Sequence, residues 1–319
     1  MLILLVLLQK LRYNLIIGRR NMLLKSMIMG VMMQNIRWDF TPRQHMTSDD
    51  YEYFHYKDEF VREVEYHNHD FFEIYFLLTG KVTYIIEGKS YKLRPGDIIL
   101  INNKELHKPV VEKGETYERI VIWVDPDFID KQGTYGTNLS MCFESSAKNH
   151  YNLLRPGLEV QKSIENIIRK FEVISSNVSY GSNILKEIYL TELIIYLNRA
   201  YLNTFEEEIE IDIEYNEKIS SIVRYINDNL QEDLSLDSLS SIFFLSKYHL
   251  LREFKKHVGY SIHQYIQKKR LIMAKGLLKQ GLPVTEVFFK CGFGDYSNFI
   301  RAFKKAFGLS PKKYYQSTL

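Results

Sequence analysis

The sequence feature that most constrains this fold is an internal repeat near the C-terminus. The segment Arg252–Ser261 (REFKKHVGYS) recurs forty-nine positions later as Arg301–Ser310 (RAFKKAFGLS). The two copies share Arg, Phe, Lys, Lys, Gly and Ser in the same order. In each copy the apolar residues recur at helical spacing, and a glycine stands where a helix C-cap is expected. The repeat therefore predicts two copies of one helical unit.

A second short helical pattern precedes each copy, over Leu236–Phe243 and Val284–Cys291, and a tight turn follows it. Ser246 and Asp295 are N-cap candidates for the helices after the turns. Two short helices joined in this way form a helix-turn-helix unit, whose second helix enters the major groove of DNA. Between the units, Ile262–Lys279 is predicted to be one long helix that fixes their relative position.

Charge is distributed unevenly along the chain. Residues 217–319 contain 17 Lys and Arg against 8 Asp and Glu, a net charge of +9, whereas the rest of the chain carries −6. A basic C-terminal third on an acidic body indicates a polyanionic partner. A repeated helical bundle with a solvated cationic surface is the alternative. Two copies with Arg and Lys-Lys on the second helix favour DNA binding.

At this point the sequence resembles the AraC/XylS family of transcription regulators. The resemblance covers about the last hundred residues and includes the family signature over Gly292–Tyr314 (GFGDYSNFIRAFKKAFGLSPKKY). Two residues depart from the pattern. Phe244 stands where the first turn often has a small residue, and Phe288 stands where the second unit usually has alanine. Local packing is therefore expected to differ at these positions.

Carried over by position, the resemblance implies a set of base-reading residues on the two second helices. Arg252 or Arg301 can make a paired contact to guanine, Asn298 can do so with adenine, and Leu251 offers apolar contact to a thymine methyl. Four lysines further along the helices are expected to contact phosphate. The base-reading candidates are Lys247, Tyr248, Leu251, Arg252, Tyr296, Ser297, Asn298 and Arg301, and the phosphate candidates are Lys255, Lys256, Lys304 and Lys305.

The N-terminal half has a β-like pattern. Short β-rich runs lie at Phe72–Leu78, Val82–Ile86, Ile98–Ile101 and Ile120–Val124, separated by turn signals that contain glycine. Strands this short and closely spaced are typical of an antiparallel barrel or sandwich. Because His67, His69, Glu73 and Gly80 resemble a cupin's first motif, the predicted fold class is α+β: a cupin-like antiparallel β-barrel with a helical dimerisation segment, followed by an all-α domain of two helix-turn-helix units.

The segment between these parts turns helical over Leu158–Leu202, and its second half has more apolar residues than a one-faced surface helix needs. It is predicted to be buried in its own domain or to form a helix-to-helix dimer contact. An acidic stretch follows, with six acids and no base. We expect an N-terminal extension over 1–36, an effector-binding and dimerisation domain over 37–203, an acidic linker over 204–216 and the DNA-binding domain over 217–319.

A candidate ligand site lies in the predicted barrel. His67, His69, Glu73 and Gly80 have the spacing of a cupin's first motif, and Pro95-Gly-Asp followed by His107 resembles the second, imperfectly. In metal-binding cupins such residues converge inside the barrel, and imidazole with carboxylate suits transition metals. Three roles stay open: an effector pocket, which we favour, a metal site, and structural hydrogen bonding. The candidate ligand-binding residues are Trp38, His67, His69, Glu73, Tyr75, Tyr84, His107 and Trp123.

The sequence thus predicts a sequence-specific DNA-binding regulator that responds to a small-molecule effector and activates a metabolic operon, such as a carbohydrate operon. We expect a cytoplasmic homodimer on double-stranded DNA, with RNA polymerase as a further partner, no membrane association, no cofactor or metal and no catalytic residues. One alternative is a metal-dependent cupin enzyme with an appended DNA-binding domain, and another is a regulator without an effector. The apolar run Met1–Leu8 is too short to span a bilayer, and Cys142 and Cys291 are expected to be reduced thiols.

Overall fold

The computed structural model describes residues 46–318, except 60–62, 113, 115, 134–135, 177–178 and 204–211. The predicted extension over residues 1–36, Trp38 and most of the acidic linker lie outside the described residues. Within the described ranges, no helix is long and apolar enough to cross a membrane.

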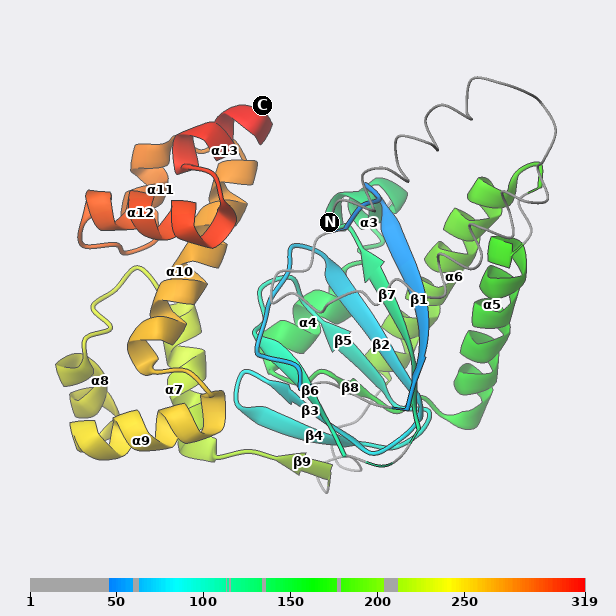
Figure 1. Cartoon of the computed structure of the whole chain (residues 1–319), viewed down its shortest axis with the longest axis horizontal. Coiled ribbons are helices and arrows are strands. Elements are labelled where there is room, and N and C mark those ends of the chain that lie inside the picture. The colour runs from blue at the N-terminus through cyan, green and yellow to red at the C-terminus, as the bar shows by residue number, and fades with distance from the viewer. Residues whose placement is uncertain are drawn as a thin grey trace, which may run out of the picture. The chain divides into compact units, whose positions relative to one another are not determined.

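The N-terminal part is built from two antiparallel sheets, shown in blue to green in Figure 1. In the described residues one sheet has the order β1-β7-β2-β5-β8 and the other β6-β3-β4-β9. The predicted cupin-like antiparallel fold is confirmed. The strands are β1 Tyr51–Asp58, β2 Phe72–Thr79, β3 Val82–Ile86, β4 Lys89–Leu93, β5 Ile98–Ile101, β6 His107–Val111, β7 Tyr117–Val124, β8 Leu153–Leu154 and β9 Ile213–Glu214.

Strand β2 is apolar on both faces because each face is buried against a different core. Phe72, Ile74 and Phe76 belong to the core shared with the helices, whereas Tyr75 and Leu77 belong to the barrel interior. Side chains alternate between the two faces of a strand, so every second residue enters the same core. Strands β5 and β7 follow the same alternation. This arrangement explains why the runs at 72–78 and 98–101 lack polar alternation.

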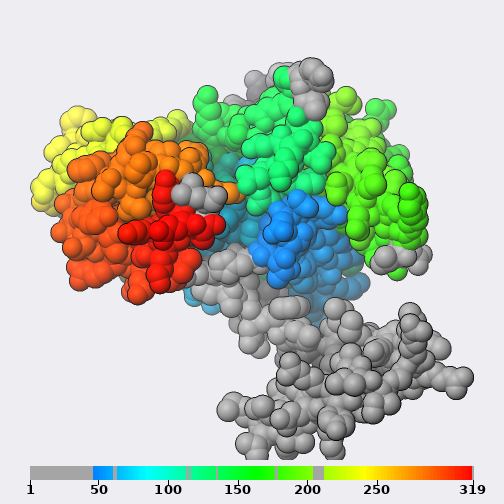
Figure 2. All heavy atoms as spheres, turned by 90° about the horizontal axis from the view of Figure 1, so that it is seen from above, coloured from blue at the N-terminus to red at the C-terminus, as the bar shows by residue number. Residues whose placement is uncertain are grey.

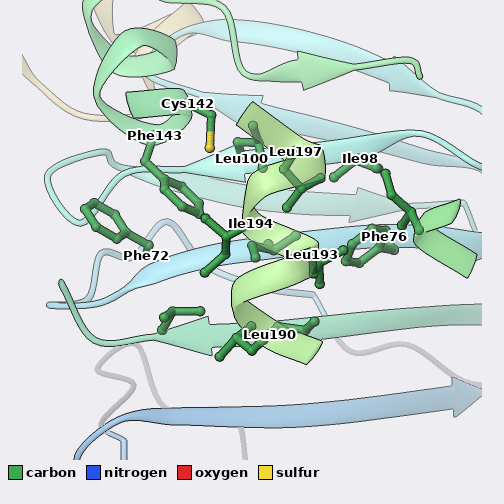
Figure 3. Packing of buried hydrophobic residues seen from close by; sticks show 14 of the residues in the cluster. Phe72, Phe76, Ile98, Leu100, Cys142, Phe143, Leu190, Leu193, Ile194 and Leu197 are labelled. Carbon is green, nitrogen blue, oxygen red and sulfur yellow. The ribbon is translucent and has the colours of Figure 1, made fainter. Parts of the chain in front are cut away.

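Helices cover the outer face of the larger sheet. Helix α6 places Leu190, Leu193, Ile194 and Leu197 against this face, and Figure 3 shows these side chains beside Ile98 and Leu100 of β5. Burial of each such side chain contributes about 1.5–3 kcal/mol. The helices of this part are α3 Pro126–Gln132, α4 Met141–Asn149, α5 Leu158–Ser176 and α6 Ser182–Leu202.

The C-terminal part is helical from Glu217 onward, coloured yellow to red in Figures 1 and 2. It has two apolar cores, and the long helix α10 contributes to both: Tyr265 lies in the first core, and Ala274 and Leu278 lie in the second. The predicted connector helix is therefore confirmed. The helices are α7 Glu217–Asp228, α8 Leu236–Phe243, α9 Lys247–Val258, α10 Ile262–Lys279, α11 Val284–Lys290, α12 Tyr296–Phe307 and α13 Pro311–Thr318.

The second helices of the two helix-turn-helix units begin and end in the same way. The Ser246 side chain accepts a hydrogen bond from His249 N at 3.3 Å, and the Asp295 side chain accepts one from Asn298 N at 2.6 Å. Gly259 and Gly308 follow the helices with φ of 80° and 79°, a left-handed conformation that residues with a Cβ rarely adopt. Both predicted caps of each helix are confirmed.

The end of the acidic segment is part of the smaller sheet. Strand β9 pairs with β4, with Tyr91 opposite Ile213. Arg155 contacts both Asp97 and Asp212, with nitrogen–oxygen distances of 2.8 and 2.5 Å, and Arg94 also contacts Asp212. The acids at this point therefore bind basic residues of the same chain.

Candidate DNA-binding surface and barrel site

The second helix of each unit has one buried face and one exposed face. Leu250 and Phe254 of α9, and Phe299 and Phe303 of α12, are fully buried. This packing turns the other side of each helix outward. All twelve predicted DNA-contacting residues are exposed: Lys247, Tyr248, Leu251, Arg252, Lys255, Lys256, Tyr296, Ser297, Asn298, Arg301, Lys304 and Lys305.

Several of these side chains contact neighbours on the same surface. Arg252 Nε donates to Glu253 Oε1 at 3.0 Å, and Arg301 Nη2 donates to Asn298 Oδ1 at 2.5 Å. Lys247 forms an ion pair with Asp237. Contacts of this kind between exposed groups are worth about 1 kcal/mol or less. They can therefore be exchanged for base or phosphate contacts at small cost.

The two departures from the family pattern have different structural consequences. Phe244 ends α8 with φ of 52° and is 92% exposed, so its ring packs on little of the first unit. Phe288 instead packs edge-on against Tyr296, with ring centroids 5.3 Å apart, and lies 6.0 Å from Phe299. Its ring thus supports one of the predicted base-reading residues.

Two basic residues of α10 are held by the protein itself. Lys269 Nζ donates to Glu87 Oε1 at 2.6 Å and to the Lys104 carbonyl at 2.8 Å, and its side chain is 8% exposed. Arg270 donates to the carbonyls of Leu230 and Glu232. Sequence reasoning missed the role of Glu87, because a glutamate in a turn before glycine is ordinarily solvated.

Glu87 lies in a polar network between the barrel and the first helix-turn-helix unit. Asn227 Nδ2 donates to Glu87 Oε2 at 2.7 Å, and Tyr265 OH donates to Asn227 Oδ1 at 3.1 Å. Burial raises the pKa of Glu87, but the charge of Lys269 and these hydrogen bonds outweigh burial and lower it overall. Leu106 of the barrel is buried in the apolar core of the same unit.

The structure brings the three barrel histidines and Glu73 together. The ring centroid of His107 lies 4.3 Å from that of His67 and 4.9 Å from that of His69. Glu73 Oε2 lies 3.3 Å from His69 Nε2. All four residues are buried, and His107 is 0% exposed. They come from β2, from β6 and from the segment before β2 that forms an isolated bridge between His67 and His107.

Two aromatic residues of the predicted set donate to the same carboxylate. Tyr84 OH donates to Glu73 Oε1, and Trp123 Nε1 donates to Glu73 Oε2, both at 3.0 Å. Tyr75 OH instead pairs with Tyr117 OH at 2.8 Å, and its ring lies edge-on to Tyr84 at 5.0 Å. Trp38 lies outside the described residues.

Burial and charge shift the pKa values in this cluster. Burial lowers the pKa of His67 to about 4 and places that of His107 well below its usual value, so both rings are neutral at pH 7. Burial raises the pKa of Glu73, but the hydrogen bond and charge of His69 outweigh burial, and the pKa falls to about 2. Glu73 is therefore a buried carboxylate anion.

A double helix-turn-helix domain with exposed basic helices, joined to a cupin-like barrel, defines a DNA-binding transcription regulator that carries a ligand-binding domain. The family model described as AraC-like ligand binding domain matches residues 52–194, and a helix-turn-helix domain model matches residues 239–317. The chain belongs to the AraC family of transcription regulators.

Curated relatives include activators of the same layout. The HTH-type transcriptional activator RhaS of Enterobacter sp. (strain 638) is 24% identical over 257 residues, which cover 77% of this chain and 86% of RhaS. RhaS of Escherichia fergusonii is 24% identical over 250 residues with the same coverage. These relatives are transcription activators, and the chain is a regulator rather than an enzyme.

Among solved structures, the C-terminal domain of AraT, a response regulator from Geobacillus stearothermophilus, is 30% identical to this chain. The match covers 32% of this chain and 86% of the AraT domain, with a TM-score of 0.31.

Proposed function

We propose that this regulator activates transcription of a metabolic operon, such as one for carbohydrate use, in response to a small molecule bound in the barrel. The observation that carries the proposal is the union, in one chain, of a buried polar cluster and two exposed basic helices. The printed names of the RhaS relatives support activation. The proposed domains are 37–203 for sensing and dimerisation, 204–216 as linker and 217–319 for DNA binding.

On the DNA, the role of each residue on the two second helices depends on its position along the helix. Arg252 and Arg301 each make a paired contact to a guanine in the major groove, and Asn298 is placed to read an adenine. Lys255, Lys256, Lys304 and Lys305 lie further along the exposed faces and contact phosphate, which sets affinity but not sequence. The single helix α10 between the units favours a fixed spacing of the two reading sites.

The effector site is proposed around Glu73, since a buried anion with His69, Tyr84 and Trp123 beside it offers acceptors, donors and aromatic surface. The segment Lys104–His107 connects this site to the DNA-binding domain. His107 lies in the cluster, Leu106 enters the first helical core, and the Lys104 carbonyl accepts from Lys269. A ligand that displaces His107 would therefore move contacts of the first helix-turn-helix unit.

We further propose a cytoplasmic homodimer that contacts RNA polymerase when bound to DNA. Helices α5 and α6 support a helix-to-helix dimer contact, because they leave large apolar side chains exposed. Ile184 is 64% exposed, Ile188 is 51% exposed and Val173 is 60% exposed. Large apolar side chains exposed on neighbouring helices commonly mark a protein interface.

The proposal is tested by selecting bound sequences from random DNA and placing the enriched site upstream of a reporter promoter. Expression of the chain is expected to raise reporter output, and one member of a panel of sugars and other small polar metabolites is expected to change it. The His69→Ala variant should keep basal DNA binding and lose that response. Repression of the reporter, or an unchanged response in His69→Ala, would contradict the proposal.

A further inference from the structure

We infer that His67, His69 and His107 bind a divalent transition-metal ion inside the barrel, beside the carboxylate of Glu73. One potential ligand atom from each of the three buried histidines lies within 4.8 Å of the other two. Imidazole nitrogen together with a carboxylate suits zinc, iron or nickel, whereas calcium and magnesium prefer sites made of oxygen alone.

The tautomers of the three rings are fixed in the same way. Each Nδ1 lies 2.8–3.0 Å from a backbone carbonyl oxygen. A carbonyl only accepts, so each Nδ1 carries the proton and each Nε2 presents its lone pair. Metal-bound histidines characteristically donate their other ring N–H to a carbonyl or carboxylate, which orients the ring. The three carbonyls belong to Glu65, Phe71 and Glu105.

Two of the Nε2 lone pairs lack a donor. His107 Nε2 is fully buried and has no hydrogen-bond partner among the described residues. His69 Nε2 faces Glu73 Oε2 at 3.3 Å, and in the neutral ring, whose proton lies on Nδ1, both atoms are acceptors. Leaving a buried acceptor unpaired costs about 1–3 kcal/mol. A cation between these atoms would satisfy both nitrogens and the Glu73 anion at once.

Other occupants explain less. A proton on His69 Nε2 would satisfy the pair with Glu73 but would leave His107 Nε2 without a partner. The ring centroids of His107 and His67 are 4.3 Å apart. A metal ion between the rings asks for little change, because nitrogens at about 2.0–2.1 Å from one ion lie about 4 Å apart at most. The rings need only draw slightly closer.

A metal ion here would add to the groups that bind the small-molecule effector, so the inference rests on the proposed sensor role of that site. It also gives that role a physical route. Contraction of the cluster would pull on His107, whose neighbour Leu106 is packed in the first helix-turn-helix core. Metal binding itself is measurable without any reporter, so it can be tested independently of activation.

The test uses the full chain, treated with chelator, dialysed and titrated with Co²⁺, whose visible absorption reports its ligands, and then with Zn²⁺. We expect one Co²⁺ per chain, displaced by Zn²⁺. His107→Ala should weaken binding more than about 100-fold, beyond the 10–100-fold lost with an outer-shell partner. His263→Ala, an exposed histidine on α10, should bind as the wild type does. His107→Cys should restore binding with a thiolate-shifted spectrum.

Circular dichroism and retention on DNA confirm that each variant is folded. If His107→Ala does not fold, His67→Gln provides the same comparison. Wild-type protein that binds no Co²⁺ stoichiometrically, or a histidine variant that binds it as the wild type does, would overturn the metal site. In that case a sugar response that is lost in His69→Ala would leave the proposed function standing. Stoichiometric metal binding with no effect of any ligand on the reporter would leave the metal site standing and overturn the proposed function.

Discussion

Replacing Lys269 with methionine should weaken the contact between barrel and DNA-binding domain, because it leaves Glu87 as a buried charge without its partner. The Nζ–Oε1 distance is 2.6 Å, and the two side chains are 8% and 4% exposed. At an effective dielectric of about 20, charges this close attract by about 6 kcal/mol. Desolvation of each ion costs several kcal/mol, so the intact pair is close to balanced.

Removal of one partner cancels the attraction and leaves one desolvation cost. Breaking a buried pair in this way typically costs about 3–5 kcal/mol, whereas replacing both charges with apolar groups is often nearly neutral. Lys269→Met and Glu87→Gln should therefore each destabilise the folded chain by up to about 3–5 kcal/mol. The double variant should be closer to wild type than the sum of the two. Separation of the domains sets the upper limit, since it returns the remaining charge to water.

The assay is a double-mutant cycle from urea unfolding at pH 7, with Lys290→Met as the control. Lys290 pairs with Glu286 at 3.3 Å on the surface, where both side chains are about half exposed, so its loss should cost under about 1 kcal/mol. The pKa of Glu87 is lowered in the folded chain, so its contribution is complete above the ordinary value of 4.5 and falls as pH drops through the folded pKa. The difference in unfolding free energy between wild type and Glu87→Gln should therefore shrink as the pH falls through the folded pKa of Glu87.

Equal, small losses in Lys269→Met and Lys290→Met would refute this reasoning. Additive losses in the double variant would do so as well, because they would mean that Lys269 and Glu87 do not interact.

Three further predictions concern DNA binding and assembly. Arg301→Ala should cost about 1–3 kcal/mol and relax discrimination at one base pair, whereas Lys304→Ala should weaken all sequences equally and lower the salt slope by about one unit; binding to a panel of sites at several salt concentrations separates the two. Residues 217–319 alone should form a helical domain that binds DNA at low salt, although they lack Leu106; circular dichroism and gel retardation test this. Ile188→Glu should convert dimer to monomer in sedimentation, and an unchanged dimer would contradict the role of α6.

The sequence predicted best where local signals agree with packing. The runs Val82–Ile86 and Ile98–Ile101 became β3 and β5 with the predicted bounds, because glycine-containing turns bracket short β-rich segments. The repeated caps Ser246 and Asp295 located the two second helices. In these places propensity, turn chemistry and burial all favour the same structure.

Elements with weaker local signals were not predicted. Strand β4 (KSYKL) is mostly polar, since only Tyr91 and Leu93 enter the barrel, and the two-residue strand β9 exists only through its pairing with β4. Helix α4 holds Cys142 and Phe143 in the core but has too few apolar residues for a clear helical period. Tertiary packing decides such segments.

The candidate sites show the same contrast between features that local sequence predicts and features that depend on tertiary packing. The His67-x-His69 spacing on an extended segment, with Glu73 beyond it, was sufficient to predict a cluster with His107. The pairing of Glu87 with Lys269 joins residues 182 positions apart, and no local pattern distinguishes Lys269 from Lys268 and Arg270 beside it. Long-range ion pairs of this kind depend on how two domains pack, which a single sequence does not reveal.

The central claim is that two separate helices of one chain read DNA, and selection from random DNA with single-arginine variants tests it most directly. The enriched wild-type site should contain two blocks of preferred bases at a fixed spacing. Arg252→Ala should remove the preference in one block and Arg301→Ala in the other, while each variant keeps the remaining block. A site with one block, or a loss in the same block for both variants, would contradict the claim.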